Sequence, residues 1–285
     1  MKTYKDALEY GKQRLLECEI EDANLDAWLL LEYVSGISRS WYFVHEDEEI
    51  SENDIEEYQM LIEQRGKHIP LQQLTKEAYF YGMKFFVNEN VLIPRQDTEV
   101  LVEQVLSLSK GKENLKLLDM CTGSGCILLA LLANLKQASG TGVDLSEKAL
   151  EVAQRNGKEL GIEVSWVQSD LFDKVSGSYD IIVSNPPYIE TSVIEGLMDE
   201  VKLYEPRMAL DGTEDGLFFY REITMQAGKY LKNNGILAFE IGYNQGKAVS
   251  EFMKENGYKE VQVLQDLAGL DRVVTGRIEK EEQHV

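Results

Sequence analysis

The alternation of short apolar runs with amphipathic segments after residue 114 constrains the fold of this chain most strongly. Runs of strand length are separated by stretches in which apolar residues recur every three or four positions, as on one face of a helix. The expected strands are 115–119, 140–144, 164–168, 180–184, 236–241 and two more that end at residue 274, and the expected helices are 126–135, 147–160, 216–230 and one that begins at residue 245. This alternation predicts an α/β fold with a seven-stranded, Rossmann-like parallel sheet covered by helices on both faces.

The first 75 residues have a different pattern. Apolar side chains recur at helical spacing from residue 4 to about residue 74, and one helix is expected to begin at Ser51, which Asp54 follows as in a capping box. Between residues 77 and 91 the pattern changes to that of a β-hairpin around Tyr81-Gly82. We therefore expect a small helical bundle over 1–75, a β-hairpin linker over 76–95 and the α/β domain over 96–285.

Charge and residue usage disfavour several classes of protein. The 285 residues include 50 acidic and 29 basic ones, and the formal net charge of -21 repels polyanions, so we expect no direct binding to nucleic acid. The 3 cysteines suggest reduced thiols rather than a disulfide framework, and the 3 histidines are too scattered for a metal site. No segment has the length of a membrane span or the apolar core of a signal peptide. The sequence therefore predicts a cytoplasmic protein with neither metal nor membrane partner.

A glycine-containing turn follows the first expected strand. It consists of Cys121, Thr122, Gly123, Ser124 and Gly125, and its two glycines let the backbone turn tightly and approach a ligand closely. Asp144 ends the next strand about 20 residues later, where a carboxylate can accept hydrogen bonds from both hydroxyls of a ribose. An ordinary loop explains the turn alone equally well, but the two features together indicate a nucleotide-like cofactor.

Two residues after the third strand fit the same cofactor. The carboxylate of Asp170 can accept the amino group of an adenine and Leu171 can pack on its ring, although a helix cap is the better explanation of Asp170 taken alone. The carboxylates do not separate NAD from S-adenosylmethionine. Because Cys121 stands where the dinucleotide fingerprint has its first glycine, and S-adenosylmethionine has no pyrophosphate to seat, the turn favours S-adenosylmethionine.

The most specific signal is the tetrapeptide Asn185-Pro186-Pro187-Tyr188. It follows the buried-strand run 181–184, at the edge of the sheet where α/β proteins bind ligands. Two successive prolines remove both amide donors and hold their carbonyls rigidly. The Asn185 side-chain oxygen and the Pro186 carbonyl can then each accept one N–H of a planar amide or amine, while Tyr188 packs against its flat face. A rigid turn that ends a strand is the alternative. We interpret the motif as a site of methyl transfer to nitrogen, with no general base needed before transfer.

These motifs resemble the HemK/PrmC family, whose members methylate the glutamine of the Gly-Gly-Gln motif in peptide chain release factors. Other segments that carry the resemblance along nearly the whole chain are Asp26-Ala27, Leu29-Leu30-Leu31, Pro70-Leu71-Gln72, Val91-Leu92-Ile93-Pro94-Arg95, Thr98-Glu99, Glu205-Pro206, Ala209-Leu210, Glu240-Ile241-Gly242, Gln245 and Asp266-Leu267-Ala268-Gly269. The chain departs from the family's usual residues at Gln73-Leu74-Thr75, Gln96-Asp97 and Met120-Cys121.

The resemblance implies a class I methyltransferase domain. It implies that S-adenosylmethionine is bound by residues 121–125 with Asp144, Leu171 and Asn185, that residues 185–188 hold the glutamine, and that the N-terminal bundle and hairpin dock the release factor, the expected protein partner. We expect a monomer. Two rivals remain open on the residues alone: a methyltransferase for the adenine amino group of DNA, which the same tetrapeptide would suit, and a non-catalytic binder of nucleotide-like ligands.

Overall fold

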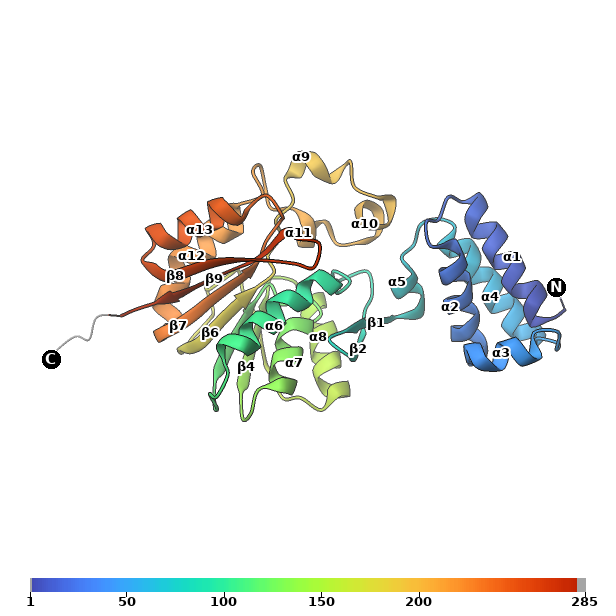
Figure 1. The fold of residues 1–285 in the computed structure, drawn as a ribbon, viewed down its shortest axis with the longest axis horizontal. Coiled ribbons are helices and arrows are strands. Elements are labelled where there is room, and N and C mark those ends of the chain that lie inside the picture. Colours follow the sequence, from blue (N-terminus) through green and yellow to red (C-terminus); the bar gives the residue numbers. More distant parts are fainter. Residues whose placement is uncertain (1, 281–285) are drawn as a thin grey trace. The chain divides into compact units, whose positions relative to one another are not determined.

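The computed structural model describes residues 2–280. The chain divides into two compact units, one formed by Met1–Glu77 together with Met198–Tyr204 and the other by Ala78–Leu197 together with Glu205–Val285 (Figure 1). Within the described residues, none of the helices has both the length and the apolar character that crossing a membrane requires.

The N-terminal unit is a bundle of helices. These are α1 (Tyr4–Glu17), α2 (Ala23–Ser35), α3 (Arg39–His45), α4 (Glu52–Arg65), α5 (Leu71–Thr75) and, from much later in the chain, α10 (Asp199–Tyr204). The Ser51 hydroxyl accepts the Asp54 N–H, so the helix start predicted at Ser51 is confirmed. Leu15, Leu30, Leu31 and Tyr58 are fully buried in one apolar core, because the apolar positions of each helix fall on its inner face.

A buried ion pair holds α10 within this unit. The side chains of Arg65 and Asp26 are 5% and 7% exposed, and the Arg65 Nε lies 2.6 Å from the Asp26 Oδ2. Arg65 also donates to the Glu200 carboxylate of α10. The Gln73 Nε2 donates to the main-chain oxygen of Tyr204 at 2.7 Å. Polar side chains of α4 and α5 therefore bind a helix that lies more than a hundred positions away in the sequence.

The C-terminal unit is built on a seven-stranded sheet in the order β5-β4-β3-β6-β7-β9-β8. The strands are β3 (Lys116–Met120), β4 (Ser139–Asp144), β5 (Ser165–Gln168), β6 (Tyr179–Ser184), β7 (Leu231–Glu240), β8 (Tyr258–Gln265) and β9 (Asp271–Ile278). The paired strands among β3, β4, β5, β6 and β7 are all parallel, whereas β9 is antiparallel to both of its neighbours, β7 and β8.

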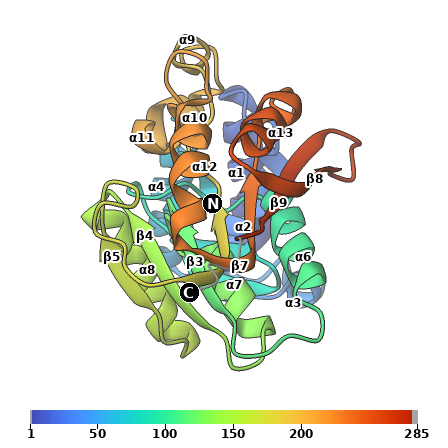
Figure 2. The same ribbon diagram turned by 90° about the vertical axis from the view of Figure 1, so that its left-hand side faces the viewer.

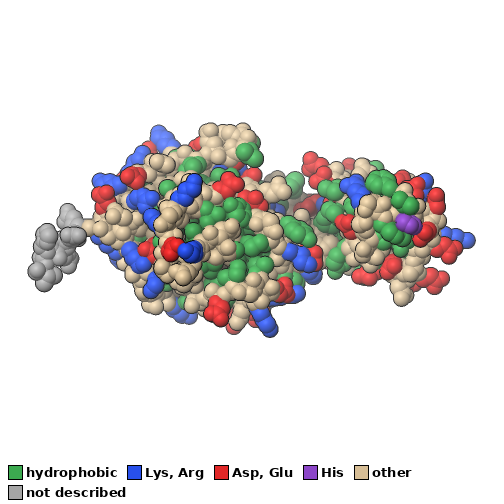
Figure 3. Space-filling model, turned by 60° about the horizontal axis from the view of Figure 1, so that its bottom comes forward, with side chains coloured by type: hydrophobic (Ala, Val, Ile, Leu, Met, Phe, Trp, Pro, Cys, Tyr) green, Lys and Arg blue, Asp and Glu red, His purple; other side chains and the backbone are tan. Residues whose placement is uncertain are grey.

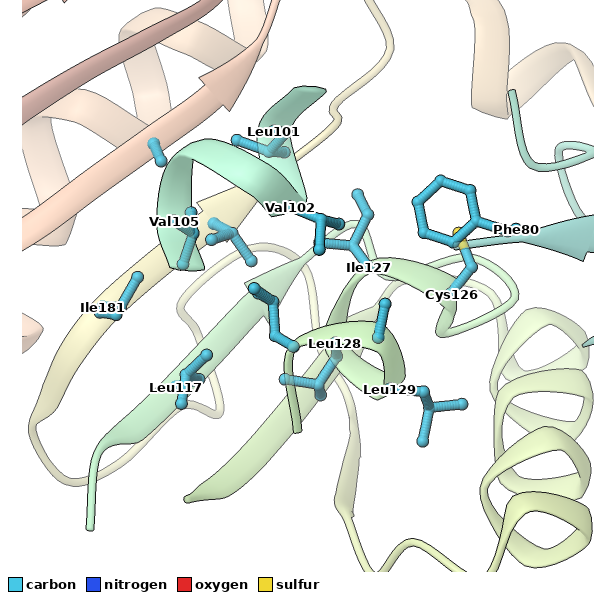
Figure 4. Close-up of a cluster of buried hydrophobic side chains, with 14 of the residues drawn as sticks. Phe80, Leu101, Val102, Val105, Leu117, Cys126, Ile127, Leu128, Leu129 and Ile181 are labelled. Carbon is cyan, nitrogen blue, oxygen red and sulfur yellow. The ribbon is translucent and has the colours of Figure 1, made fainter. Parts of the chain in front are cut away.

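Helices cover both faces of this sheet, as predicted. Figure 2 shows α6 (Glu99–Leu108) and α7 (Cys126–Asn134) on one side and α12 (Phe218–Tyr230) and α13 (Gly246–Glu255) on the other. Leu117 and Ile181 belong to the core under α6 and α7 (Figure 4), while the next residues, Leu118 and Ile182, belong to the core under α12 and α13. Successive side chains of a strand point to opposite faces, so a strand buried on both faces is a continuous apolar run.

The remaining elements are short. The hairpin predicted around Tyr81-Gly82 is confirmed as β1 (Glu77–Phe80) and β2 (Met83–Phe86), with φ values of 50° and 73° at the two turn residues. α8 (Glu147–Leu160), also predicted, lies between β4 and β5 in sequence, and the single turn η1 (Gln96–Thr98) precedes α6. In the sequence, the short helix α9 (Thr191–Ile194) precedes α10 and the short helix α11 (Arg207–Leu210) follows it.

Two details of the predicted sheet are wrong. The last strand ends at Ile278 instead of residue 274, and the sheet is mixed rather than wholly parallel. β8 and β9 are joined by the short connection 266–270, in which Asp266 accepts the N–H groups of Ala268 and Leu270. So short a connection can join only antiparallel strands, because a parallel pair needs a long crossover.

Candidate functional site

The turn after β3 and the tetrapeptide after β6 begin side by side in the middle of the sheet. Met120 and Ser184 are partners in the register of these two strands, and the Ser184 hydroxyl donates to the Met120 carbonyl at 2.6 Å. β4 and β5 extend the sheet on one side of β3, and β6 begins the other side, so the strand order reverses here. Open α/β sheets bind ligands at such a reversal, outside the carboxyl ends of the strands.

The turn after β3 has an unusual backbone. Cys121, Gly123 and Gly125 have φ values of 60°, 55° and 79°, a left-handed conformation that costs a residue with a Cβ about 1–2 kcal/mol. Cys121 therefore adopts a glycine-like conformation at the position where the dinucleotide fingerprint has its first glycine. A Cβ on Gly125 would lie 3.0 Å from the Trp166 ring, whereas the corresponding position on Gly123 has no heavy atom within 4 Å. Gly125 permits close packing, and Gly123 faces open space.

Asp144 is fixed by the main chain. Its Oδ2 accepts the Gly123 N–H and its Oδ1 accepts the Ser146 N–H, both at 2.9 Å. Burial raises the pKa of Asp144, while these two hydrogen bonds act in the opposite direction. The carboxylate keeps lone pairs beyond these two bonds, so an oriented acceptor lies beside the open face of Gly123.

The tetrapeptide combines two buried prolines with a partly exposed asparagine. Pro186 and Pro187 are buried, and Asn185 is half-buried and makes no side-chain hydrogen bond to any residue between 2 and 280. The Tyr188 hydroxyl lies 3.4 Å from the Glu240 Oε1, and its ring packs against the core under α12 and α13. Asn185 is therefore the member of the motif with a free amide.

One open pocket brings most of the predicted site residues together. Its lining includes Cys121, Thr122, Gly123, Ser124, Asp144, Asn185 and Pro187. Further walls come from the segments 90–98 and 206–209, which carry part of the family resemblance but were not predicted to belong to the site, and from Leu145 and Phe219. The lining is mostly apolar with a few polar groups, as in small-molecule sites.

Five predicted residues do not line this pocket: Gly125, Asp170, Leu171, Pro186 and Tyr188. Asp170 is exposed at the end of β5, and Leu171, with φ of 42°, packs against the core under α12 and α13.

Comparisons with known proteins identify the family. Residues 6–75 match the PrmC N-terminal domain, and residues 96–201 match the methyltransferase small domain. The release factor glutamine methyltransferase of Geobacter sulfurreducens is 39% identical over 277 residues, which are 97% of this chain and 97% of that protein. The one of Fusobacterium nucleatum is 43% identical over 278 residues, 96% of this chain and 77% of that protein. This chain belongs to the release factor glutamine methyltransferase family. The resemblance inferred from the motifs is thus confirmed.

Solved structures agree with the fold. The 16S rRNA N2 G1207 methyltransferase of T. thermophilus, in complex with AdoMet and guanosine, matches with a TM-score of 0.51 at 16% identity, over 71% of this chain and 50% of that chain. At that identity the likeness shows the fold alone. The predicted Rossmann-like methyltransferase fold of this member of the release factor glutamine methyltransferase family is confirmed.

Sequence reasoning missed Asp119 in this family member. Its side chain is fully buried one residue before the end of β3, its Oδ2 accepts the Thr122 hydroxyl at 2.6 Å, and its Oδ1 has no partner in the described part of the chain. Burial, with a smaller contribution from Asp144, raises the pKa of Asp119 to about 7. A carboxyl group directly after Leu117 and Leu118 was the available signal, because an aspartate is rarely buried without a reason.

We expect Asp119 to make stability depend on pH. Its pKa of about 7 in the folded protein lies above its ordinary value of 3.8, so the free energy of unfolding should fall as pH rises from about 4 to about 7, by at most about 1.4 kcal/mol per pH unit. In Asp119→Asn this part of the decline should be absent. Urea unfolding at several pH values measures both slopes. Identical slopes in the two proteins would contradict the assignment.

We expect Asp144→Ala to weaken donor binding. The substitution removes the acceptor for the Gly123 and Ser146 N–H groups and the acceptor proposed for the ribose hydroxyls, so the dissociation constant of S-adenosylmethionine should rise about 10- to 100-fold. Asp173→Ala, which removes an exposed carboxylate outside the pocket, is the control. Isothermal titration calorimetry measures both, and equal affinities in the two variants would contradict the role of Asp144.

Proposed function

We propose that this chain transfers a methyl group from S-adenosylmethionine to the side-chain amide nitrogen of the glutamine in the Gly-Gly-Gln motif of peptide chain release factors. The proposal follows the names of the curated relatives, which match along nearly the whole chain. The observation that carries it in the structure is the free amide of Asn185, at the pocket wall directly beside the turn 121–125.

The pocket has the features that the donor requires. Gly123 faces open space, Asp144 offers carboxylate oxygens beside it, and most of the lining is apolar. The turn has no third glycine for a pyrophosphate, and S-adenosylmethionine needs none. We assign donor binding to residues 121–125, Asp144 and Asn185; Asp170 and Leu171 belong to this proposal only as contacts to the adenine end, outside the pocket.

When bound, S-adenosylmethionine supplies a methyl group on a positively charged sulfur. The amide nitrogen of glutamine is a poor nucleophile, because its lone pair is delocalised into the carbonyl. The Asn185 Oδ1 and the Pro186 carbonyl would each accept one of its N–H groups and turn the nitrogen toward the methyl carbon. Transfer would form the C–N bond as the S–C bond breaks, with the electron pair left on sulfur, and the nitrogen would then release one N–H proton to solvent. No catalytic carboxylate is required.

The partners and surroundings are part of the same proposal. We infer that the N-terminal unit docks the release factor. Phe43 and Val44 of α3 are 71% and 77% exposed, so they present apolar surface on this unit. Figure 3 shows apolar side chains beside acidic ones on the surface of the protein. We further infer that the chain acts as a monomer in the cytoplasm and binds no nucleic acid directly, in accord with its net charge of -21.

The test is methyl transfer from labelled S-adenosylmethionine to a purified release factor. Label should appear on the glutamine of Gly-Gly-Gln and disappear when that glutamine is replaced by alanine. The relatives' names do not favour the rival function, methylation of adenine in DNA. Label on a duplex oligonucleotide and none on the release factor would revive it, and no label on either would leave only a binding protein.

A further inference from the structure

Gln245 links three loops behind the tetrapeptide. It lies between β7 and α13 and is 8% exposed. Its Oε1 accepts the Gly242 N–H at 2.9 Å, and its Nε2 donates to the Tyr188 carbonyl at 3.0 Å and to the Gly216 carbonyl at 3.1 Å. Both N–H groups of the amide are therefore used, and no other common side chain of this length supplies two donors and an acceptor without a charge.

Two glycines pack closely against the main chain of Tyr188. A Cβ on Gly212 would lie 2.7 Å from the Tyr188 Cα, and one on Gly216, where φ is 68°, would collide with the Tyr188 carbonyl oxygen. The next residue is also fixed, because the Ile189 N–H donates to the Leu210 carbonyl at 3.0 Å and the Gly212 N–H donates to the Ile189 carbonyl at 2.8 Å. The main chain at Tyr188 is thus packed tightly on one side and bonded to Gln245.

The ring of Tyr188 is held as well. Its hydroxyl lies 3.4 Å from the Glu240 Oε1, and the Glu240 carbonyl accepts the Tyr220 hydroxyl at 2.9 Å. Glu240 is 2% exposed, and its Oε2 has no partner among the residues that the structure describes. The side-chain hydrogen bonds to Tyr188 therefore come from the segment 240–245, and Asn185 and Pro187 are the members of the motif that line the pocket.

The tetrapeptide has few internal degrees of freedom. Proline rings fix φ near -65° at Pro186 and Pro187, so the path of the segment depends mainly on how its two ends are held. The front end is held by the pairing of β6 with β3 and by the Ser184 hydroxyl on the Met120 carbonyl. The rear end is held by Gln245 on the Tyr188 carbonyl.

We propose that Gln245 is a positioning residue for methyl transfer, which fixes the rear end of the tetrapeptide and thereby aims the Asn185 and Pro186 oxygens. The inference rests on the proposed function, because these oxygens matter only if they hold a substrate N–H. Gln245 itself is not among the residues that line the pocket. Its loss should therefore lower turnover and leave donor binding nearly unchanged.

The experiment compares Gln245→Ala and Gln245→Glu with the unsubstituted chain. Glutamate has nearly the same size and keeps an acceptor for the Gly242 N–H, but it loses both donors and places negative charge beside two carbonyls. We expect kcat with a release factor to fall about 10- to 100-fold in both variants, and the dissociation constant of S-adenosylmethionine to change less than about threefold. Ser250→Ala is the matched control, since it removes a buried hydrogen bond within α13 that touches neither Tyr188 nor Gly216.

A second measurement does not depend on turnover. Amide hydrogen exchange at Ile189 and Gly212 should become faster in both Gln245 variants and stay unchanged in Ser250→Ala. Unchanged kcat in a folded Gln245 variant, or a loss confined to donor affinity, overturns the positioning role, as does unchanged exchange at these two amides. Absence of methyl transfer by the unsubstituted chain overturns the proposed function instead, so the two failures are distinguishable.

Discussion

Replacement of Asn185 by alanine should lower kcat for release-factor methylation about 100- to 1000-fold and change the dissociation constant of S-adenosylmethionine much less. The side chain removed is the free amide at the pocket wall, and loss of one oriented hydrogen-bonding group at a reacting centre typically has an effect of this size. An interaction made mainly in the transition state lowers kcat and kcat/KM together, so KM for the release factor should stay nearly constant. Single-turnover transfer of labelled methyl measures the effect.

Asn256→Ala is the matched control for this prediction. Asn256 is exposed at the end of α13, and its side-chain amide donates to the Phe252 carbonyl of its own helix. That variant should keep full turnover. If Asn185→Ala instead keeps its turnover and loses donor affinity, the asparagine belongs to the donor site alone and the substrate nitrogen must be held by other groups.

The fold could be predicted where burial leaves a periodic pattern. β3 and β6 each contain consecutive apolar residues, because Leu117 and Leu118, like Ile181 and Ile182, belong to the cores on opposite faces of the sheet, and α8 has a clear amphipathic spacing. α9 and α11 are too short, at four residues each, for a helical period to be visible. The short connection 266–270 would have predicted that β9 is antiparallel to β8. The alternation of strands and helices earlier in the domain indicated a parallel sheet instead.

The candidate site could be predicted where a residue belongs to it because it lies at the carboxyl end of a strand. Asp144 ends one parallel strand and Asn185 follows another, so their place at the carboxyl edge of the sheet could be inferred without knowledge of packing. Gln245 and Asn156 act through partners far away in the sequence: the Asn156 side chain bonds the Ser124 carbonyl of the turn and the main chain of Phe86. Such contacts depend on the folded path of the chain, and the sequence indicates them only where a polar residue such as Asn156 falls on the buried face of a helix.

Loss of the Arg65 side chain should strongly destabilise the N-terminal unit. In Arg65→Ala the Asp26 carboxylate stays buried without its cation, and α10 loses its bond through Glu200. Removal of one partner of a buried ion pair typically costs about 3–5 kcal/mol, a large part of the stability of a small domain. Hydrogen exchange of the amides in α2 and α4 should report this loss within the unit.

The pH dependence of that loss identifies its cause. Burial raises the pKa of Asp26, and Arg65 opposes the rise, so the pKa of Asp26 should climb further in Arg65→Ala. Protonated Asp26 needs no cation, and the difference in stability between the two proteins should therefore shrink as pH falls toward about 4, the ordinary range of an aspartate. A loss that is constant across pH would point to packing of the arginine stem instead of its charge.

Arg14 provides the contrast within the same unit. It pairs with Glu63 through two hydrogen bonds of 2.7 and 2.9 Å, in nearly the geometry of a bidentate ion pair, but the two side chains are 39% and 43% exposed. Water solvates both charges whether or not they are paired, so Arg14→Ala should leave amide exchange in α2 and α4 close to that of the unsubstituted chain. Equal effects of the two substitutions would show that burial of the ion pair at Arg65 contributes nothing beyond contact between the charges.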